Sequence, residues 1–337
     1  FSDHECSTYE EVKQKLATGM NILLRIGSAA NNMDGVLRRI AKEKLPTRNM
    51  MFCTDDKHIE DIRREGHINA NARMAVAAGI DPIDAIKMAS YNAARAYGIR
   101  GVGAIAPGYK ADMVLLEDLK DFKVKQVISR FGRPYTGEEQ IPSPILPPQV
   151  FNSVRLPEIS KYDLALRCHV SAPVIKMIPH QLVTELVYRD VERDENGCFI
   201  PSEGMVKLAV IERHHATGSM AVGILEGLGI KHGAVASTVA HDSHNLVVAG
   251  DNDEDMLMAI ESLRDCGGGY SVVSRGGVLA RLPLPIAGLM TAAPVNDVLE
   301  IQQALLDALY SLGAKRDSDP LIALSFMALP VIPAVKL

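Results

Sequence analysis

The segment NMMFCTDDKHIED (residues 49–61) carries the pattern that decides the fold. A short apolar run leads directly into Thr54, Asp55 and Asp56, and His58 follows closely. An apolar run of this length that ends in a polar loop is typical of a buried strand in an α/β protein. Proteins of this class place their chemistry at the carboxyl ends of such strands.

Two interpretations of the adjacent carboxylates follow from elementary chemistry. Thr54 or Asp55 can cap a following helix, because short oxygen-bearing side chains accept hydrogen bonds from free backbone N–H groups. Alternatively, Asp55 or Asp56 is a metal ligand that also carries a proton. A cap needs one such residue only. The second carboxylate and His58 therefore favour a functional site.

The surrounding residues 1–100 alternate strand-like and helix-like segments, as expected for βα units. Ser7 and Glu10 form a predicted capping box at the first helix, and Asp81 is a predicted N-cap with Pro82 at the first helical position. A strand begins at residue 21, before the loop GSAANN. Helices are predicted at residues 7–20, 33–45, 69–80 and 82–99.

The chain changes character after residue 100. Residues 101–150 predict a small β unit, with strands at 113–116 and 124–129, and four prolines between residues 142 and 148 predict a linker. Residues 151–337 predict another mixed α/β unit, including a helix at 253–266 that glycines end.

The composition restricts the class of protein. The chain has 337 residues, 47% of them apolar and 23% charged, which predicts a globular protein of two or three domains. A net charge of −5 without a basic block argues against nucleic acid or an anionic membrane as the partner. No apolar stretch is long enough to span a bilayer. The five cysteines form no CxxC pair and indicate reduced thiols in a cytoplasmic protein.

Histidines supply further candidates. His4 lies in SDHECS at a predicted strand end, where it is either a metal ligand or a surface residue of a polar loop. Four of the ten histidines fall in ERHHATG (residues 212–218) and AHDSHN (residues 240–245). The local Val, Ser and Thr content around the second motif predicts a strand–loop–strand. One such polar loop can be explained by Asp and Ser side chains that form hydrogen bonds to the backbone. Two such loops at strand ends favour a functional site.

Taken together, these motifs resemble the amidohydrolase superfamily. SDHECS, GSAANN, FCTDDKHIEDIRREGHIN and DPIDAIKMASYNAARAYGIRGVGAIAPGYKADMVLLED resemble the latter part of its metal-dependent barrel and the return into its small β-sandwich. ERHHATG, AHDSHN and LPLPIAGLM are similar to the extra C-terminal domain of the adenine deaminase family. The resemblance implies the C-terminal part of a (β/α)8 barrel at 1–100, a β-sandwich segment and linker at 101–150, and an α/β domain at 151–337.

The resemblance also implies the roles of individual residues. His4 matches the strand-6 metal ligand, Asp55 matches the strand-8 metal ligand and catalytic group, and Asp56 is a second catalytic residue. The remaining ligands of a binuclear manganese or iron site would precede Phe1. We therefore expect the chain to be part of a longer protein, since a whole barrel takes roughly 250 residues. Substrate contacts are expected from Arg25, Ser28, His58, His241, Asp242 and His244.

The implied activity is the hydrolytic deamination of adenine to hypoxanthine and ammonia, in purine salvage or adenine catabolism, by a cytoplasmic homo-oligomer. One departure is that Ile26 stands where family members carry Glu. We hypothesise that the loop of His241, Asp242 and His244 helps to close the site or contacts the purine. Alternatives are another purine or cyclic-amide hydrolase, or a catalytically incomplete fragment with a binding role.

Overall fold

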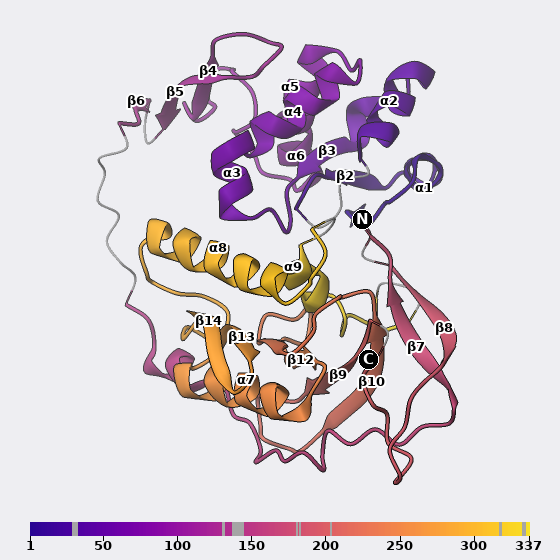
Figure 1. Ribbon diagram of the computed structural model, residues 1–337. Helices are drawn as coiled ribbons and strands as arrows, with labels where there is room; N and C mark the ends of the chain where they lie inside the picture. Colours follow the sequence, from indigo (N-terminus) through magenta and orange to yellow (C-terminus); the bar gives the residue numbers. More distant parts are fainter. Residues whose placement is uncertain are drawn as a thin grey trace. The chain divides into compact units, whose positions relative to one another are not determined.

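The computed structural model describes residues 1–28, 33–129, 132–136, 145–179, 181, 183–202, 204–316, 319–331 and 335–337. The chain divides into two compact units, Phe1–Pro144 and Ile145–Leu337 (Figure 1).

The first unit is built around a parallel sheet in the order β1-β2-β3. The three strands are separated in sequence by helices, as predicted for βα units, and further helices follow the third strand. The strands are β1 (Ser2–Asp3), β2 (Asn21–Arg25) and β3 (Met50–Cys53). The helical elements are α1 (Tyr9–Ala17), α2 (Met33–Glu43), η1 (Thr47–Asn49), α3 (Ile59–Glu65), α4 (Ile68–Ala77), α5 (Pro82–Ala89) and α6 (Tyr91–Ala96).

Burial of apolar side chains on this sheet explains why the strands form. Ile22 and Leu24 alternate with half-buried residues along β2 and are fully buried, and Met50 and Met51 are fully buried on β3. Each fully buried side chain of this size contributes about 2 kcal/mol relative to an exposed one. The strands that carry the polar candidates at their ends are therefore held by the core of this unit.

Two local predictions in this unit are wrong in detail. The capping box of α1 is formed by Thr8 and Glu11 rather than by Ser7 and Glu10. Thr8 has the extended backbone of an N-cap, so its hydroxyl meets the N–H of Glu11, and the Glu11 carboxylate accepts the N–H of Thr8 in return. Ser7 also donates to Glu11, which places it one residue outside the helix.

The single helix predicted over residues 82–99 is broken at Ser90 into α5 and α6. Ser90 has a non-helical backbone, with φ −143° and ψ −78°, and its hydroxyl donates to the carbonyl of Ile86 at 2.6 Å. A serine that bonds backward to the preceding turn competes with helix propagation. The start of α5 is as predicted, because the Asp81 carboxylate accepts the N–H groups of Ile83 and Asp84.

A small antiparallel sheet completes the first unit, and it confirms the strands predicted at 113–116 and 124–129. Its strands are β4 (Met113–Leu116), β5 (Val124–Ser129) and β6 (Arg133–Pro134). Residues 137–144, which include part of the predicted proline-rich linker, lie outside the described residues. The short helix η2 (Pro148–Asn152) follows in the second unit.

The second unit contains an eight-stranded sheet in the order β14-β13-β11-β12-β9-β10-β7-β8. Neighbouring strands are antiparallel except for the parallel pair β10 and β7. The strands are β7 (Ser171–Met177), β8 (Thr184–Asp190), β9 (Met205–Ile211), β10 (Met220–Glu226), β11 (Ala234–Ser237), β12 (Leu246–Gly250), β13 (Gly269–Ser274) and β14 (Gly277–Pro283).

Helices cover both faces of this sheet (Figure 1). On the central strand β9, Leu208 packs in the cluster that contains Leu305 of α8, whereas Ile211 packs in the cluster that contains Ile260 of α7. Both faces of β9 are buried, which explains its unbroken apolar sequence. The helices are α7 (Asp253–Cys266), α8 (Val295–Ser311) and α9 (Pro320–Ser325).

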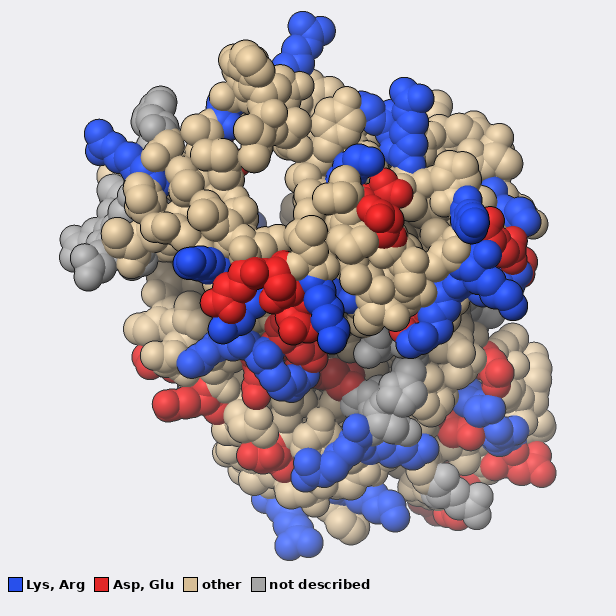
Figure 2. Space-filling view, turned by 90° about the horizontal axis from the view of Figure 1, so that it is seen from above, with Lys and Arg blue, Asp and Glu red and all other residues tan. Residues whose placement is uncertain are grey.

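Helix α7 is confirmed as predicted, and it ends at Gly267 in the left-handed conformation. Helix α8, with 17 residues, was not predicted. No helix of the described residues is long and apolar enough to cross a membrane. On the face of the molecule in Figure 2, acidic and basic side chains lie next to one another rather than in one basic patch.

Candidate functional site

The first candidate site lies where the parallel strands of the first unit end. All three strands run in the same direction, so their carboxyl ends meet at one edge of the sheet. His4 and Glu5 follow β1, Arg25 ends β2, and Asp55 follows β3. Arg25 pairs in register with Cys53, which brings it beside the polar segment after β3.

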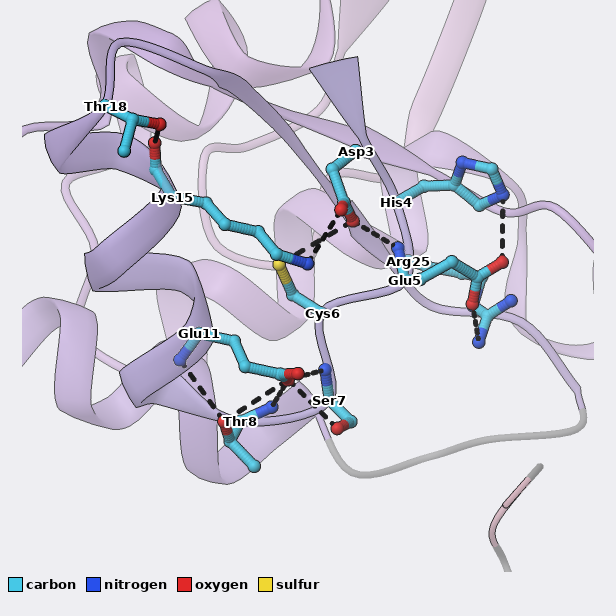
Figure 3. A network of polar contacts seen from close by, with 10 residues as sticks. All are labelled: Asp3, His4, Glu5, Cys6, Ser7, Thr8, Glu11, Lys15, Thr18 and Arg25. Carbon is cyan, nitrogen blue, oxygen red and sulfur yellow. Dashed lines mark hydrogen bonds and ion pairs between the residues drawn. The ribbon is translucent and has the colours of Figure 1, made fainter. Parts of the chain in front are cut away.

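Arg25 connects the two outer strand ends. One guanidinium nitrogen, Nη1, donates to Oδ2 of Asp55 at 2.8 Å, and the other, Nη2, lies 3.3 Å from Oε2 of Glu5. The second oxygen of Glu5 lies 3.2 Å from Nε2 of His4. Figure 3 shows Glu5 between His4 and Arg25. His4, Glu5, Arg25 and Asp55 therefore form one continuous chain of polar contacts across the sheet edge.

The Arg25 side chain is 10% exposed, so its charge is largely removed from water. Burial alone would lower the pKa of Arg25, but its hydrogen bond to the Asp55 carboxylate and the charges of Glu5, Asp55 and Asp56 outweigh burial and raise the pKa. Arg25 remains a cation that holds the carboxylates of both neighbouring strand ends. Glu5, which makes this network continuous, was not among the predicted site residues.

The helix-cap interpretation of the 54–56 segment is wrong. Helix α3 begins after its N-cap His58, so neither Thr54 nor Asp55 is the N-cap residue. The Thr54 hydroxyl instead lies 3.0 Å from Nε2 of His67, and Asp55 is bonded to Arg25. Asp55 also has a positive φ of 49°, a conformation that non-glycine residues adopt uncommonly. This backbone conformation directs the chain sharply after β3.

Gly27 leaves the room that Asp56 occupies. A Cβ atom on Gly27 would lie 1.6 Å from Oδ1 of Asp56 and 2.9 Å from the carbonyl oxygen of Thr54. Any larger residue at position 27 would therefore displace the 54–56 segment. Gly27 was not predicted as a site residue, although a glycine directly after the apolar run of β2 is a signal of close backbone approach.

Ser28 links the loops that follow β2 and β3. Its hydroxyl donates to Asp61 and accepts the backbone N–H of His58 at 2.9 Å. The predicted substrate residues Ser28 and His58 are thus brought together, and Ser28 fixes the entry to α3. Residues 29–32 of the loop GSAANN lie outside the described residues.

The two cysteines near this edge are poor nucleophiles. Burial, followed by the charge of Asp55, raises the pKa of Cys53 to about 12. Burial and the charge of Asp3 raise the pKa of Cys6 to about 11. Since the thiolate is the reactive form, neither residue is available for covalent catalysis near neutral pH.

The second candidate site is a polar cluster in the second unit. Arg213, two residues after the end of β9, is 1% exposed, and its Nε donates to the His244 carbonyl at 2.6 Å. Its Nη2 donates to the Ala287 carbonyl at 3.1 Å. Nε2 of His214 lies 2.8 Å from the Ser243 carbonyl. These contacts join the 212–218 and 241–245 segments that the sequence singled out.

The structure confirms the strand–loop–strand over β11 and β12, with His241, Asp242 and His244 in the loop between them. The His241 and His244 rings lie 6.0 Å apart between centroids, and the His241 ring packs 4.6 Å from that of Phe326. The Glu212 carboxylate accepts the N–H groups of His214, His215 and Thr217. These hydrogen bonds, that of Thr217 first, lower the pKa of Glu212 to about 2.

The stability of the second unit is expected to depend on pH because of His244. Burial lowers the pKa of His244 below its usual value of 6.5, and His241 and Arg213 lower it further. The unfolded chain therefore takes up a proton at a higher pH than the folded chain, so stability falls as the pH drops below about 6.5. Chemical denaturation followed by circular dichroism between about pH 7 and about pH 5 measures this loss.

His244→Asn is expected to reduce this dependence, because Asn does not titrate and tolerates the positive φ of 50° at this position. His215→Asn removes an exposed imidazole from the same cluster and is the matched control. An unchanged pH dependence in the His244 variant would contradict the assignment.

Two family models match the chain. Residues 7–133 match the amidohydrolase family, and residues 181–337 match the adenine deaminase C-terminal domain. The adenine deaminase of Nitratidesulfovibrio vulgaris strain DP4 is 47% identical over the whole chain, and that of Desulfitobacterium hafniense strain Y51 is 41% identical. The resemblance to the adenine deaminases of the amidohydrolase family is thereby confirmed.

The similarity covers only part of the length of these relatives. The chain spans 59% of the length of the Nitratidesulfovibrio and Desulfitobacterium proteins, and 58% of the adenine deaminase of Lysinibacillus sphaericus strain C3-41, which is 41% identical.

The amidohydrolase family implies a divalent metal, which can be tested against the residues of this chain. His4 and Asp55 offer two donors of suitable chemistry, imidazole and carboxylate. However, they follow β1 and β3, which lie on opposite sides of β2 and hence roughly 10 Å apart. Within the described part of the chain, no group of three or more His, Cys, Asp or Glu side chains is placed to hold a metal. These residues alone do not form a metal centre.

Proposed function

We propose that this chain is the C-terminal part of an enzyme that hydrolyses adenine to hypoxanthine and ammonia. The observation that carries the proposal is the identity of 40–47% to proteins named adenine deaminase over the whole chain. The polar chain from His4 to Asp55 across parallel strand ends supports it, because hydrolases of the α/β class react at such edges.

In this proposal Asp55 is the proton carrier of the reaction. In this hydrolysis the oxygen of a water molecule attacks C6 of the purine. A base must take one proton from the water and deliver it to the ring or to the departing amine. A carboxylate suits this role because it is ionised near neutral pH and is regenerated when ammonia leaves. The carboxylate of Asp56 occupies the space that a side chain at position 27 would fill, and in this proposal Asp56 has a supporting catalytic role.

The substrate contacts remain proposals on both units. Ser28 and His58 lie together and are candidates for hydrogen bonds to the purine edge. Arg25 forms ion pairs with Asp55 and Glu5. It is therefore a candidate for orienting the Asp55 carboxylate as well as for contacting the substrate. In the second unit, His241, Asp242 and His244 share one loop, and we propose that this loop takes part in purine binding or in closing the site.

For the intact enzyme we propose a (β/α)8 barrel, of which the β1–β2–β3 segment is the C-terminal part, with a β-sandwich segment over 101–150 and a separate domain over 151–337. His4 and Asp55 would contribute to a binuclear manganese or iron site together with ligands from outside this chain. We further propose a cytoplasmic homo-oligomer that acts in purine salvage or adenine catabolism and binds neither nucleic acid nor membranes.

A substrate panel tests the activity. The full-length protein from which this chain comes is incubated with Mn²⁺ or Fe²⁺ and with adenine, guanine, adenosine and cyclic amides such as dihydrouracil. We expect ammonia release with adenine at the highest kcat/KM, and none from the 337-residue chain alone. Preferred turnover of another purine or of a cyclic amide would establish the alternative substrate class. No turnover of any of these compounds would support a non-catalytic binding role.

A further inference from the structure

We propose that strand β8 forms a two-fold interface, in which it pairs antiparallel with β8 of a second copy of this chain. β8 ends the eight-stranded sheet of the second unit, and the described part of the chain places no further strand beside it (Figure 1). The inference gives an interface to the homo-oligomer of the proposed function. It rests on that oligomer alone and not on the activity towards adenine.

The two edges of this sheet differ in how they are protected. At one edge, β14 ends at Pro283, pairs with β13 through an irregular register and lies beside α8. Proline residues, bulges and covering helices are features by which proteins block strand edges. β8 contains no proline, and its register with β7 is regular along the whole strand. β8 is therefore the edge that is better suited to accept a further strand.

The ladder between β7 and β8 determines which backbone groups point outward. Directly after β8, the N–H of Val191 donates to the carbonyl of Val170 at 2.8 Å, which makes this a hydrogen-bonded pair. Such pairs alternate along an antiparallel ladder, so Arg189, two residues earlier, also turns its backbone groups toward β7. Leu186 and Tyr188 consequently turn their N–H and C=O groups away from the sheet, toward an added strand.

The sequence of β8 is complementary to itself about Val187. A two-fold axis at this residue places Leu186 opposite Tyr188 of the second copy, so that their outward backbone groups can form hydrogen bonds. The same axis places Glu185 opposite Arg189 of the second copy, and Arg189 opposite the second Glu185. An axis at Leu186 or at Tyr188 would instead place Val187 opposite one of the two charges. Charge complementarity therefore selects the register centred on Val187.

The two charged side chains are accessible for this pairing. Those of Glu185 and Arg189 are 50% and 41% exposed. Glu185 receives a hydrogen bond from Lys176 through Oε2, and Arg189 donates to Glu226 through Nε and Nη2. Oε1 of Glu185 and Nη1 of Arg189 can therefore approach the second copy while the contacts within the chain are kept.

The opposite face of β8 supplies apolar contacts to the same interface. Leu186 and Tyr188 are 50% and 65% exposed, and Pro173, which pairs with Tyr188 across the hairpin, is also exposed. In the register centred on Val187, each Leu186 side chain lies beside a Tyr188 ring of the second copy. Aromatic and aliphatic side chains that face one another across paired strands stabilise the sheet. Burial of these side chains thus favours the same axis as the charges do.

Disulfide trapping of Val187→Cys in the full-length protein tests the interface. Opposite residues in a non-hydrogen-bonded pair have Cα atoms about 4.5 Å apart, which lies within the range of roughly 4.4–6.8 Å that a disulfide spans. We expect most of the Val187→Cys chains to run as a covalent dimer on a non-reducing gel after treatment with oxidised glutathione. Sedimentation velocity is expected to give a dimer for the unmodified protein.

Two exposed positions provide a second test that does not alter the half-buried Val187. Leu186→Cys and Tyr188→Cys are expected to form a mixed disulfide when the two variants are combined, because these positions face one another in the proposed register. Each variant alone is expected to remain uncrosslinked, as is the unmodified protein with its native cysteines. Efficient cross-linking of Leu186→Cys alone would overturn the proposed register.

A monomer in sedimentation, or a dimer in which neither Val187→Cys nor the mixed variants cross-link, would overturn the interface. In the second case the dimer contact lies elsewhere on the chain, and β8 is left to another segment of the full-length protein. Ammonia release from adenine is measured on the same unmodified sample. Turnover without cross-linking would reject the interface and leave the proposed activity standing, whereas cross-linking without turnover would do the reverse.

Discussion

Under the proposed function, Asp55→Asn is expected to lower kcat/KM for adenine roughly 10³-fold in the full-length protein, because an amide would neither accept nor return the proton of the attacking water. Asn has nearly the same shape and also tolerates the positive φ of 49° at this position. The replacement therefore keeps the backbone conformation after β3 and removes the proposed base, the Asp55 carboxylate. The measurement is the initial rate of ammonia release over a range of adenine concentrations.

The matched control for this change is Asp34→Asn. Asp34 is 51% exposed and bonded to Arg38, so the replacement also removes a carboxylate from an arginine pair, but on the outer face of α2. We expect a rate within twofold of the unmodified enzyme, since exposed pairs of this kind contribute about 0.3–0.5 kcal/mol to stability and nothing to the reaction. An active Asp55→Asn enzyme would transfer the proton-carrying role to another residue, with Asp56 the next to test.

The largest stability effect is expected at Gly269, the first residue of β13. Its φ of 131° suits glycine alone, and a Cβ atom there would lie 1.9 Å from the carbonyl oxygen of Leu282 on β14. That neighbour is backbone and cannot rotate away. Gly269→Ala should therefore destabilise the second unit by roughly 3 kcal/mol or more, through both backbone strain and separation of the two strands.

Gly276→Ala separates these two causes. Gly276 also has a positive φ, of 73°, but nothing lies within 4 Å of the position its Cβ would take. Its replacement should cost about 1 kcal/mol, the price of the left-handed backbone alone. Hydrogen exchange of amides in β9 and β13 reports on this unit specifically, which matters because two compact units need not unfold together. Equal protection in the two variants would contradict the predicted clash.

Local sequence patterns predicted the elements that local forces determine. The apolar run of β3, the Asp81–Pro82 start of α5 and the glycine end of α7 are each encoded within a few residues. The shift of the capping box from Ser7 to Thr8 marks the limit of such patterns. Both residues bear a hydroxyl, and the backbone conformation at Thr8 decided between them.

The parts that were not predicted depend on how distant segments align. Glu5 becomes part of the network because parallel pairing brings its strand beside Arg25, some 20 residues later in the chain. Gly27 matters because of Asp56, which lies after the next strand. The local sequence around one of these residues does not reveal its partner in a distant segment. The register between the strands must be known first.

The contacts of Arg213 have a consequence for how freely the second unit can vary. Its guanidinium bonds the carbonyl oxygens of residues 244 and 287, and every residue type carries such an oxygen. Substitutions at His244 or Ala287 therefore leave these two acceptors in place, provided that the backbone path is kept. One buried side chain can thus hold two loops in place even when the side chains of those loops differ. This applies to homologues as well as to variants that are redesigned for a new ligand.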